Sequence, residues 1–420
     1  MAFAQPGNDS PYSYYGIGNL VDTRLVRYSG MGGLGVAVRE DSIPFAVNFC
    51  NPASYTAIRF TSFDIAGYGS IATLRDANTT EDVNKANLSY FALGFPITKW
   101  WGGAFGIRNF STLGYTSISS EEVAYADDSL TVTWIQQGKG GVDQFYIGAG
   151  FKPFKNFSFG FNASFLFGTI SRIRLTEVGE QNFFSSSTFD EVTVRGFYFD
   201  YGLQYTIPIK SSSLTLGLWG AAPLDVYAPM SRVSTMYYPT IGGISDRDTV
   251  VMRDSSTWMH MPLRLGIGAM AQIGRKWGVG GEFLYEQWSQ FRDTEGKSEG
   301  LGDLWRGSVG VEFRPSFEYN KRGFWSYFGK MHYRIGGFYA QSQYVIAGNR
   351  VPEYGTTIGL GFPVSRMRAG DNQFVQSMVN ISVEWGQRGS VSNGLLLEDY
   401  WKFKLGFTLN DKWFIKRKYF

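Results

Sequence analysis

Seven charged side chains occupy polar positions in segments where apolar and polar residues alternate. They are Arg108, Arg264, Glu282, Glu286, Glu384, Lys402 and Lys404. An arginine in such a set, for example Arg108 or Arg264, can anchor the carboxylate head group of a ligand through charge-assisted hydrogen bonds. The same residues can instead pair with one another and rigidify the structure around them. The sequence leaves both interpretations open, and we favour mutual ion pairs.

Catalysis and metal binding need combinations of residues that this sequence does not offer. There are two histidines, His260 and His332, and one cysteine, Cys50. A hydrolase needs a base placed beside its nucleophile, yet the two histidines fall near opposite ends of different segments. Two histidines and one cysteine also make no metal cluster. We therefore expect no enzyme activity, no cofactor and no metal, and a net charge of +3 is too small to indicate nucleic acid as a partner.

The segment 157–167 indicates which structure positions these charges. Its five phenylalanines stand at odd positions, and small or polar residues fill nearly every even position. Because a β-strand sends successive side chains to opposite faces, this strand has one apolar and one polar face. Lipid outside and water inside a barrel explain both faces. The segment 401–409 alternates likewise, and its polar face carries Lys402 and Lys404, which a dry core would accommodate only at high cost.

Composition supports a membrane barrel. The chain has 420 residues, of which 44% are hydrophobic, 17% aromatic and only 18% charged, and 52 are glycine. No uninterrupted apolar stretch reaches the roughly 18 residues that a transmembrane helix requires. The predicted fold class is all-β, a transmembrane antiparallel β-barrel, with a large soluble β-protein as the alternative.

The spacing of alternating segments predicts about fourteen strands between residues 59 and 410. An even number places both chain ends on the periplasmic side of an outer membrane. Tight connections at 96–100, 153–156, 208–213 and 274–276 alternate with long ones at 118–141, 175–191, 223–257 and 388–399. Short periplasmic turns and longer extracellular loops give this rhythm. Residues 411–420 are interpreted as a periplasmic tail, or alternatively as the end of the last strand.

The predicted extracellular loop 223–257 is unusually apolar. Its candidate contact residues are Tyr227, Met230, Met236, Tyr237 and Tyr238. An apolar loop of this length outside a membrane usually serves a function. It can capture a hydrophobic ligand, dock a partner protein, or fold over the barrel mouth, and the sequence does not decide among the three.

Residues 1–58 do not alternate and contain Gly30, Gly32, Gly33 and Gly35. We expect this segment to fold into the lumen as a hatch, because a barrel of about fourteen strands is wider than its own side chains fill. The run 29–38 is followed by Asn51-Pro52-Ala53 and then by the first strand. In this order the motifs resemble the FadL family of outer-membrane transporters, and residues 10–18 are similar to Bacteroidota members of that superfamily.

The resemblance implies a fourteen-stranded barrel plugged by the hatch, with Asn51, Pro52 and Ala53 as hatch residues. It also implies uptake of hydrophobic, fatty-acid-like small molecules, which leave after hatch movement or through a side opening at a kinked third strand. Gly102, Gly103 and Gly106 are candidates for that kink, but glycine is common throughout this barrel, and we favour the interpretation that they are ordinary strand residues. The partners implied are outer-membrane lipids and lipopolysaccharide and a hydrophobic small molecule.

The alternative function is a non-transporting accessory or scaffold subunit of an outer-membrane secretion or barrel-assembly complex, because relatives of the family in Bacteroidota include such proteins. The two functions predict different interiors. A transporter should contain a continuous apolar pocket beneath the loops. A scaffold should contain a filled lumen and an exposed apolar loop or strip that contacts other subunits.

Overall fold

The computed structural model describes residues 10–21, 24–40, 46–76, 79–125, 128–178, 183–240, 243–315, 324–364, 377–392 and 395–411. Its 19 strands form one antiparallel sheet that closes on itself where β19 pairs with β2. No helix in these ranges is long and apolar enough to cross a membrane.

The strands that form the first half of the ring follow one another along the chain, each hydrogen-bonded to the next. They are β2 (Thr61–Arg75), β3 (Thr80–Pro96), β4 (Trp101–Tyr125), β5 (Asp128–Phe154), β6 (Phe157–Val178) and β7 (Ser185–Ile209). The second half ends with β14 (Trp277–Glu286), β15 (Leu304–Phe313), β16 (His332–Ile346), β17 (Asn349–Pro363), β18 (Met378–Arg388) and β19 (Leu397–Asp411).

Between these halves, two barrel strands are each built from three pieces. The first consists of β8 (Ser212–Ala221), β9 (Leu224–Tyr227) and β10 (Met230–Thr240), and the second of β11 (Gly243–Ser255), β12 (Trp258–Met261) and β13 (Arg264–Ile273). Pro223, Pro229 and Pro262 fall at three of the four breaks, since proline has no N–H for the ladder. Counted in this way the barrel has 14 antiparallel strands, which confirms the predicted fold class.

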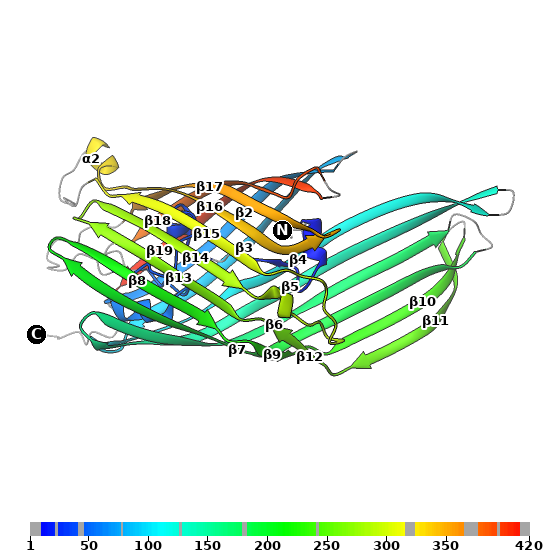
Figure 1. Cartoon of the computed structure of the whole chain (residues 1–420), viewed down its shortest axis with the longest axis horizontal. Helices are drawn as coiled ribbons and strands as arrows, with labels where there is room; N and C mark the ends of the chain where they lie inside the picture. The colour runs from blue at the N-terminus through cyan, green and yellow to red at the C-terminus, as the bar shows by residue number, and fades with distance from the viewer. Residues whose placement is uncertain are drawn as a thin grey trace, which may run out of the picture.

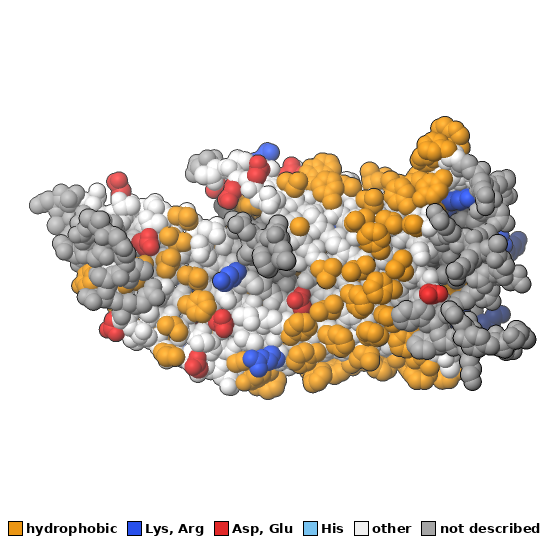
Figure 2. All heavy atoms as spheres, turned by 180° about the vertical axis from the view of Figure 1, so that it is seen from behind, with side chains coloured by type: hydrophobic (Ala, Val, Ile, Leu, Met, Phe, Trp, Pro, Cys, Tyr) orange, Lys and Arg blue, Asp and Glu red, His pale blue; other side chains and the backbone are white. Residues whose placement is uncertain are grey.

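The alternation in β6 sorts side chains as predicted. Phe159 and Phe161 are 39% and 41% exposed on the outer surface, whereas Ser158 and Asn162 are buried toward the lumen. Figure 2 shows hydrophobic side chains gathered in a band around the barrel, with Asp and Glu side chains more frequent beyond it. This band is the lipid-facing surface expected of a transmembrane barrel.

The prediction of long loops at one end of the barrel is wrong for three segments. We call the end where β2 begins and β19 ends the base, and the opposite end the rim. The segments predicted as loops at 118–141, 175–191 and 223–257 are largely strands that continue past the rim. Together they form a wall of residues 113–125, 128–140, 170–178, 185–194, 230–240 and 243–255 (Figure 1). Alternation fades there because neither face meets lipid, while the backbone ladder continues.

The described part of the N-terminal segment, residues 10–58, lies inside the ring of strands. It contains the short helices η1 (Pro11–Tyr14), α1 (Val26–Ser29) and η2 (Pro52–Ala57) and the two-residue strand β1 (Asn19–Leu20). Nearly all of its described side chains are buried against inward-facing barrel positions. The barrel itself runs from Thr61 to Asp411, where the sequence predicted 59–410. The predicted tail lies outside the described residues except for Asp411, which ends β19.

Candidate functional site in the barrel lumen

Asn51-Pro52-Ala53 docks the N-terminal segment onto the inner face of the barrel. The Asn51 side chain is completely buried and accepts a hydrogen bond from the Ala53 N–H at 3.1 Å, which caps η2. Its amide nitrogen donates to the carbonyl oxygens of Leu203 in β7 and Leu218 in β8, both at 3.2 Å. One side chain therefore starts a helix and fastens it to two barrel strands.

Glycines in the barrel make room for this docking. A Cβ atom on Gly202 would lie 1.9 Å from Oδ1 of Asn51, and one on Gly160 would lie 2.5 Å from the carbonyl carbon of Pro52. A Cβ on Gly102 would lie 2.2 Å from the carbonyl oxygen of Tyr55. Any larger residue at these three positions would push the N-terminal segment away from the inner face of the barrel.

The glycine-rich run 30–35 fits against a second set of barrel glycines on the opposite side. A Cβ on Gly30 would lie 2.5 Å from Cα of Gly359. Met31 is completely buried, and its backbone lies against Gly310 and Gly336 of β15 and β16. Gly32 adopts a positive φ of 71° close to backbone oxygens of these strands, a combination that only glycine accepts readily. The segment is thus wedged between two glycine-lined surfaces.

A buried charge network ties the segment to the base. Glu312 of β15 is fully buried and accepts hydrogen bonds from Nε of Arg314 and from Nε of Arg334, both at 2.9 Å. Arg27 of α1 lies 3.2 Å from Glu40 and 3.9 Å from Glu312, and Arg314 lies 3.5 Å from Glu40. None of these five residues was predicted from the sequence. Inward alternation on β15 and β16 was the available signal, since Glu312 stands directly opposite Arg334.

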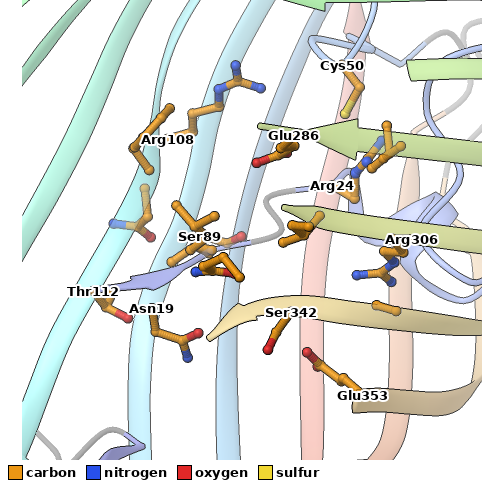
Figure 3. Close-up of a pocket in the computed structure, with 18 of the residues that line it drawn as sticks. Asn19, Arg24, Cys50, Ser89, Arg108, Thr112, Glu286, Arg306, Ser342 and Glu353 are labelled. Atoms are coloured by element: carbon orange, nitrogen blue, oxygen red, sulfur yellow. The ribbon is translucent and has the colours of Figure 1, made fainter. Parts of the chain in front are cut away.

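Nearer the rim, the segment and the barrel enclose a cavity of about 180 Å³. Arg24 reaches it from the N-terminal segment, Arg108 from β4 and Arg306 from β15 (Figure 3). Eight of its lining residues are Lys or Arg and three are Glu. Cations thus outnumber carboxylates in the lining, and apolar side chains such as Val36, Phe110 and Leu284 contribute to it as well.

Six of the seven charged residues singled out in the sequence line this cavity, and all seven have neighbours of opposite charge. Arg264 contacts Glu286 at 2.7 Å, and Glu384 lies 3.3 Å from Lys402 and 3.5 Å from Lys404. Arg108 lies 4.0 Å from Asp200 and donates to Gln144 at 2.9 Å. Glu282 stands outside the cavity lining, where it accepts the Gly35 and Val36 N–H groups and lies 3.0 Å from Arg24. The pairs of Arg264 and Glu384 join neighbouring strands, whereas Arg108 reaches from β4 to β7 and Glu282 pairs with the N-terminal segment.

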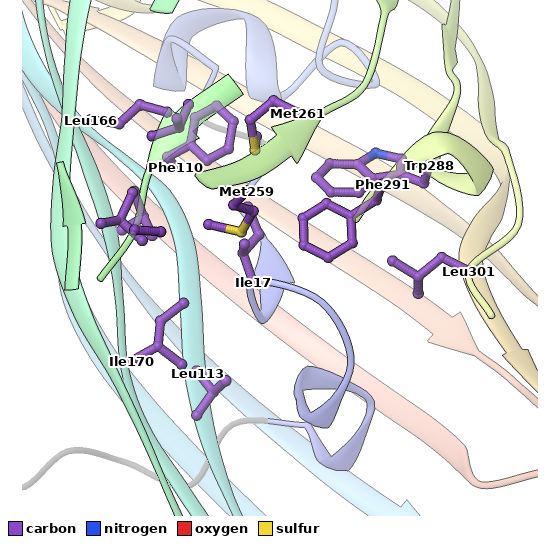
Figure 4. Packing of buried hydrophobic residues seen from close by; sticks show 14 of the residues in the cluster. Ile17, Phe110, Leu113, Leu166, Ile170, Met259, Met261, Trp288, Phe291 and Leu301 are labelled. Carbon is purple, nitrogen blue, oxygen red and sulfur yellow. The ribbon is translucent and has the colours of Figure 1, made fainter. Parts of the chain in front are cut away.

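An apolar cluster packs between the cavity and the rim (Figure 4). The cluster contains Ile17 of the N-terminal segment, Phe110 of β4 and Met259 of β12. It also contains Trp288 and Phe291 from the connection between β14 and β15, and all five are buried. Phe110, like Trp219 and Leu284 of the same cluster, also lines the cavity, so this packed apolar part of the upper lumen adjoins the cavity directly.

The candidate residues of the predicted loop 223–257 are separated by the strands they actually occupy. Tyr227 ends β9 and packs edge-to-face on Trp258 with ring centroids 5.4 Å apart. Met230 is buried in the apolar cluster, and Tyr237 is also buried. Met236 is 41% exposed on β10, and Tyr238 contacts Phe184. The five do not converge on one ligand site.

The third barrel strand, β4, pairs on both sides along its glycines. Gly102, Gly103 and Gly106 pair with β3 on one side and β5 on the other, as the favoured interpretation of ordinary strand glycines expects, and no kink forms at them. Pairing with β3 instead ends at Arg108, just before a bulge between Asn109 and Ser111. β1 pairs with β4 immediately above this point.

Within the described ranges, no group of three His, Cys, Asp or Glu side chains is placed to hold a metal ion.

Solved structures similar to this chain are outer-membrane transporters rather than enzymes. A FadL homologue from Pseudomonas aeruginosa is 13% identical with a TM-score of 0.60, covering 93% of this chain and 99% of that chain. The toluene transporter TbuX from Ralstonia pickettii is 14% identical with a TM-score of 0.56, covering 91% and 97%. The toluene transporter TodX from Pseudomonas putida is 14% identical with a TM-score of 0.54, covering 93% and 98%.

At such identities the likeness establishes the fold. The chain has the fold of the FadL-type β-barrels, which confirms the fold implied by the resemblance of its N-terminal motifs. No curated protein matches the sequence. A family model does match it, named BamG, and the match runs over residues 1–420. The chain therefore belongs to the BamG family.

Proposed function

We propose that this chain is a non-transporting subunit of an outer-membrane complex for secretion or for assembly of other barrels, in which a closed barrel serves as a scaffold. The observation that carries the proposal is the locked lumen. Withdrawing the N-terminal segment would separate Arg24 from Glu282 and Arg27 from Glu312, both in buried surroundings. Breaking one buried pair by removing a partner typically costs about 3–5 kcal/mol, so an open state is strongly disfavoured.

The chemistry of the cavity supports the same proposal. A hydrophobic substrate gains free energy by leaving water for an apolar surface, yet most of the charged groups lining this space are cations. The apolar side chains of the upper lumen pack against one another and against Ile17 of the N-terminal segment. The wall, in contrast, carries exposed apolar side chains beyond the lipid-facing band, such as Val250 and Met252 at 56% and 73% exposure. A scaffold uses surfaces of this kind to contact other proteins.

In this proposal the base, where β19 ends, faces the periplasm and the wall faces the cell exterior, while η1 lies near the rim, where Tyr12 donates a hydrogen bond to the carbonyl oxygen of Leu396. The short connections at the base, including 97–100, 155–156 and 274–276, support this orientation. The lipids around the band are then outer-membrane phospholipids on the base side and lipopolysaccharide on the wall side.

The test is isolation of the protein from its native membrane in a mild detergent, with mass spectrometry of both proteins and lipids. We expect stoichiometric partner proteins and no hydrophobic molecule in the lumen. A barrel that purifies alone with a bound hydrophobic ligand would overturn the proposal. Uptake of a hydrophobic dye by cells with and without the gene gives an independent measurement, and we expect the two rates to be equal.

A second candidate function, passage of a hydrophobic small molecule, rests on the end of pairing between β3 and β4. Above Tyr90 and Arg108, no ladder in the described residues joins these two strands, and Ser89, Asn109 and Thr112 beside this point line the cavity. If this route operates, replacement of Asn51, Pro52 and Ala53 together should loosen the plug and raise leakage of small hydrophobic dyes. Unchanged leakage would contradict a gating role for these three residues.

A further inference from the structure

Strand β11 presents one unpaired edge at the side of the wall. It pairs with β10 from Gly243 to Ser255, and no other described strand pairs with it. Every residue from Asp248 to Asp254 is exposed, and Val250, Val251 and Met252 are 56%, 42% and 73% exposed. An apolar, β-forming centre therefore stands in the open on a strand that is hydrogen-bonded on one side only.

Lipid does not cover this edge. Trp258 and Tyr227 pack edge-to-face at the rim side of the lipid-facing band, a position typical of interfacial aromatic residues. Met252 lies six positions further from the base than Trp258, which is about 20 Å along a strand. Asp248, Arg253 and Asp254 flank the apolar centre with full charges, which the hydrocarbon region would exclude.

An edge of this kind is a liability for a protein that works alone. Unpaired N–H and C=O groups next to exposed apolar side chains invite other strands, and proteins commonly protect such edges with proline or lysine. Residues 243–255 contain neither, and their five charged residues stand on either side of an uncharged centre at 249–252, which they leave open to a partner strand. Inner positions of the same wall are satisfied within the chain, since Asp190 pairs with both Arg174 and Arg232. The wall has two free edges among the described residues, since β4 beyond Thr112 pairs only with β5. The edge of β11 differs in carrying three consecutive exposed apolar residues, Val250 to Met252.

We propose that β11 is a docking edge, to which a partner protein outside the cell adds an extended segment as a further strand. This inference rests on the proposed scaffold function and names the site of contact. Main-chain hydrogen bonds supply affinity in such strand addition, and alternate side chains supply specificity. The segment should carry β-branched or apolar residues opposite Val250 to Met252. A basic residue should face Asp248 and an acidic one should face Arg253.

A second copy of this chain is a poor occupant for a geometric reason. Two barrels in one membrane point the same way, so the two-fold axis that relates them runs along the membrane normal. That axis brings the two β11 strands together in parallel and in register. Asp248 would then face Asp248 and Arg253 would face Arg253, and like charges directly opposite each other destabilise a sheet.

The test uses cysteine labelling, which the chain permits because its only cysteine, Cys50, is buried. Val250→Cys and Met252→Cys report on the edge, and Ile118→Cys on β4 is the matched control at 65% exposure. Each variant is treated with a membrane-impermeant maleimide, in intact cells and after purification as a single barrel. We expect labelling at 250 and 252 to be at least tenfold slower in cells, with less than a twofold difference at 118. Equal rates in both preparations at all three positions would overturn the docking edge.

A second set of variants separates strand addition from general shielding. With Val251→Cys as the reporter, Val250→Lys and Met252→Lys should raise labelling in cells to the rate of the purified barrel, because charges at the centre oppose an apolar strand. Continued protection would overturn the inference, as would oxidant-induced homodimers of Met252→Cys in cells. If an isolated complex contains partner proteins but leaves position 252 freely labelled, the docking edge is refuted and the scaffold function stands. Absence of any complex refutes the scaffold function itself.

Discussion

Replacing Glu312 by Gln should destabilise the barrel more than almost any other single charge change. Glu312 is fully buried and accepts from Arg314 and Arg334, each with an N–O distance of 2.9 Å, while Arg27 lies 3.9 Å away. Glu40 is the other carboxylate that pairs with this group. Glu312→Gln therefore changes a net charge of about +1 in the network to about +2, without altering the shape of the side chain.

The magnitude follows from the contacts. Two opposite unit charges about 3 Å apart attract by roughly 5 kcal/mol at an effective dielectric constant of about 20. Desolvation of the same groups costs several kcal/mol and offsets most of the attraction while the pair exists. Removing one partner leaves the desolvation cost without its compensation, so we expect a loss of about 3–5 kcal/mol in the free energy of unfolding.

The measurement is urea unfolding in detergent micelles, followed by tryptophan fluorescence and by the mobility shift of folded barrels on gels. Asp225→Asn is the control, because its pair with His260 is exposed and should contribute less than about 1 kcal/mol. The double variant Glu312→Gln with Arg334→Met restores the original net charge and should lose less stability than Glu312→Gln alone. A loss below about 1 kcal/mol in Glu312→Gln would refute the idea that buried charge locks the N-terminal segment.

Two further perturbations test the same interior. In Gly202→Val the new side chain overlaps Asn51. We therefore expect increased ion conductance and a loss of about 1–3 kcal/mol in the free energy of unfolding. Gly307→Ala is the control and should change neither quantity, because its Cβ has no neighbour within 4 Å. Glu299, in the rim connection, accepts a hydrogen bond from the Gly16 N–H, and burial raises the pKa of its carboxyl above the ordinary value. An acid with a raised pKa stabilises the folded state in its protonated form and loses that contribution as the pH rises through the folded pKa. Hydrogen exchange near Gly16 should therefore quicken with increasing pH beyond its intrinsic rise, and Glu299→Gln should remove this excess.

Much of the fold was predictable because a barrel strand meets two solvents. Phe159 and Ser158 are adjacent in β6 and face opposite sides of the barrel, and that difference is already visible as alternation in the sequence. The number of strands and the inward position of Lys402 and Lys404 follow from the same periodicity. The wall was missed since its two faces are both outside lipid, so residues 128–140 and 243–255 lack the contrast that marks a membrane strand.

The charged residues that face the lumen could be predicted from the sequence, but the ion pairs that they form could not. Alternation placed Arg264, Glu286 and Glu384 on the inner face, yet it did not say which charges would meet. It overlooked Arg27 and Glu40, because the N-terminal segment has no period that assigns its side chains to a face. Gly102 was considered as a candidate for a kink in β4, whereas in the structure it makes room for the backbone of Tyr55.

The sequence by itself determined a barrel with an apolar exterior and a charged interior, because each residue's preference for lipid or water is local and repeats every second position. Only the tertiary structure decided which barrel strands the N-terminal segment contacts, that Glu312 meets Arg27, and that β11 ends the wall with a free edge. These features depend on how strands far apart in the chain are brought together when the barrel closes, and contacts across a closed ring have no periodic signature in the sequence.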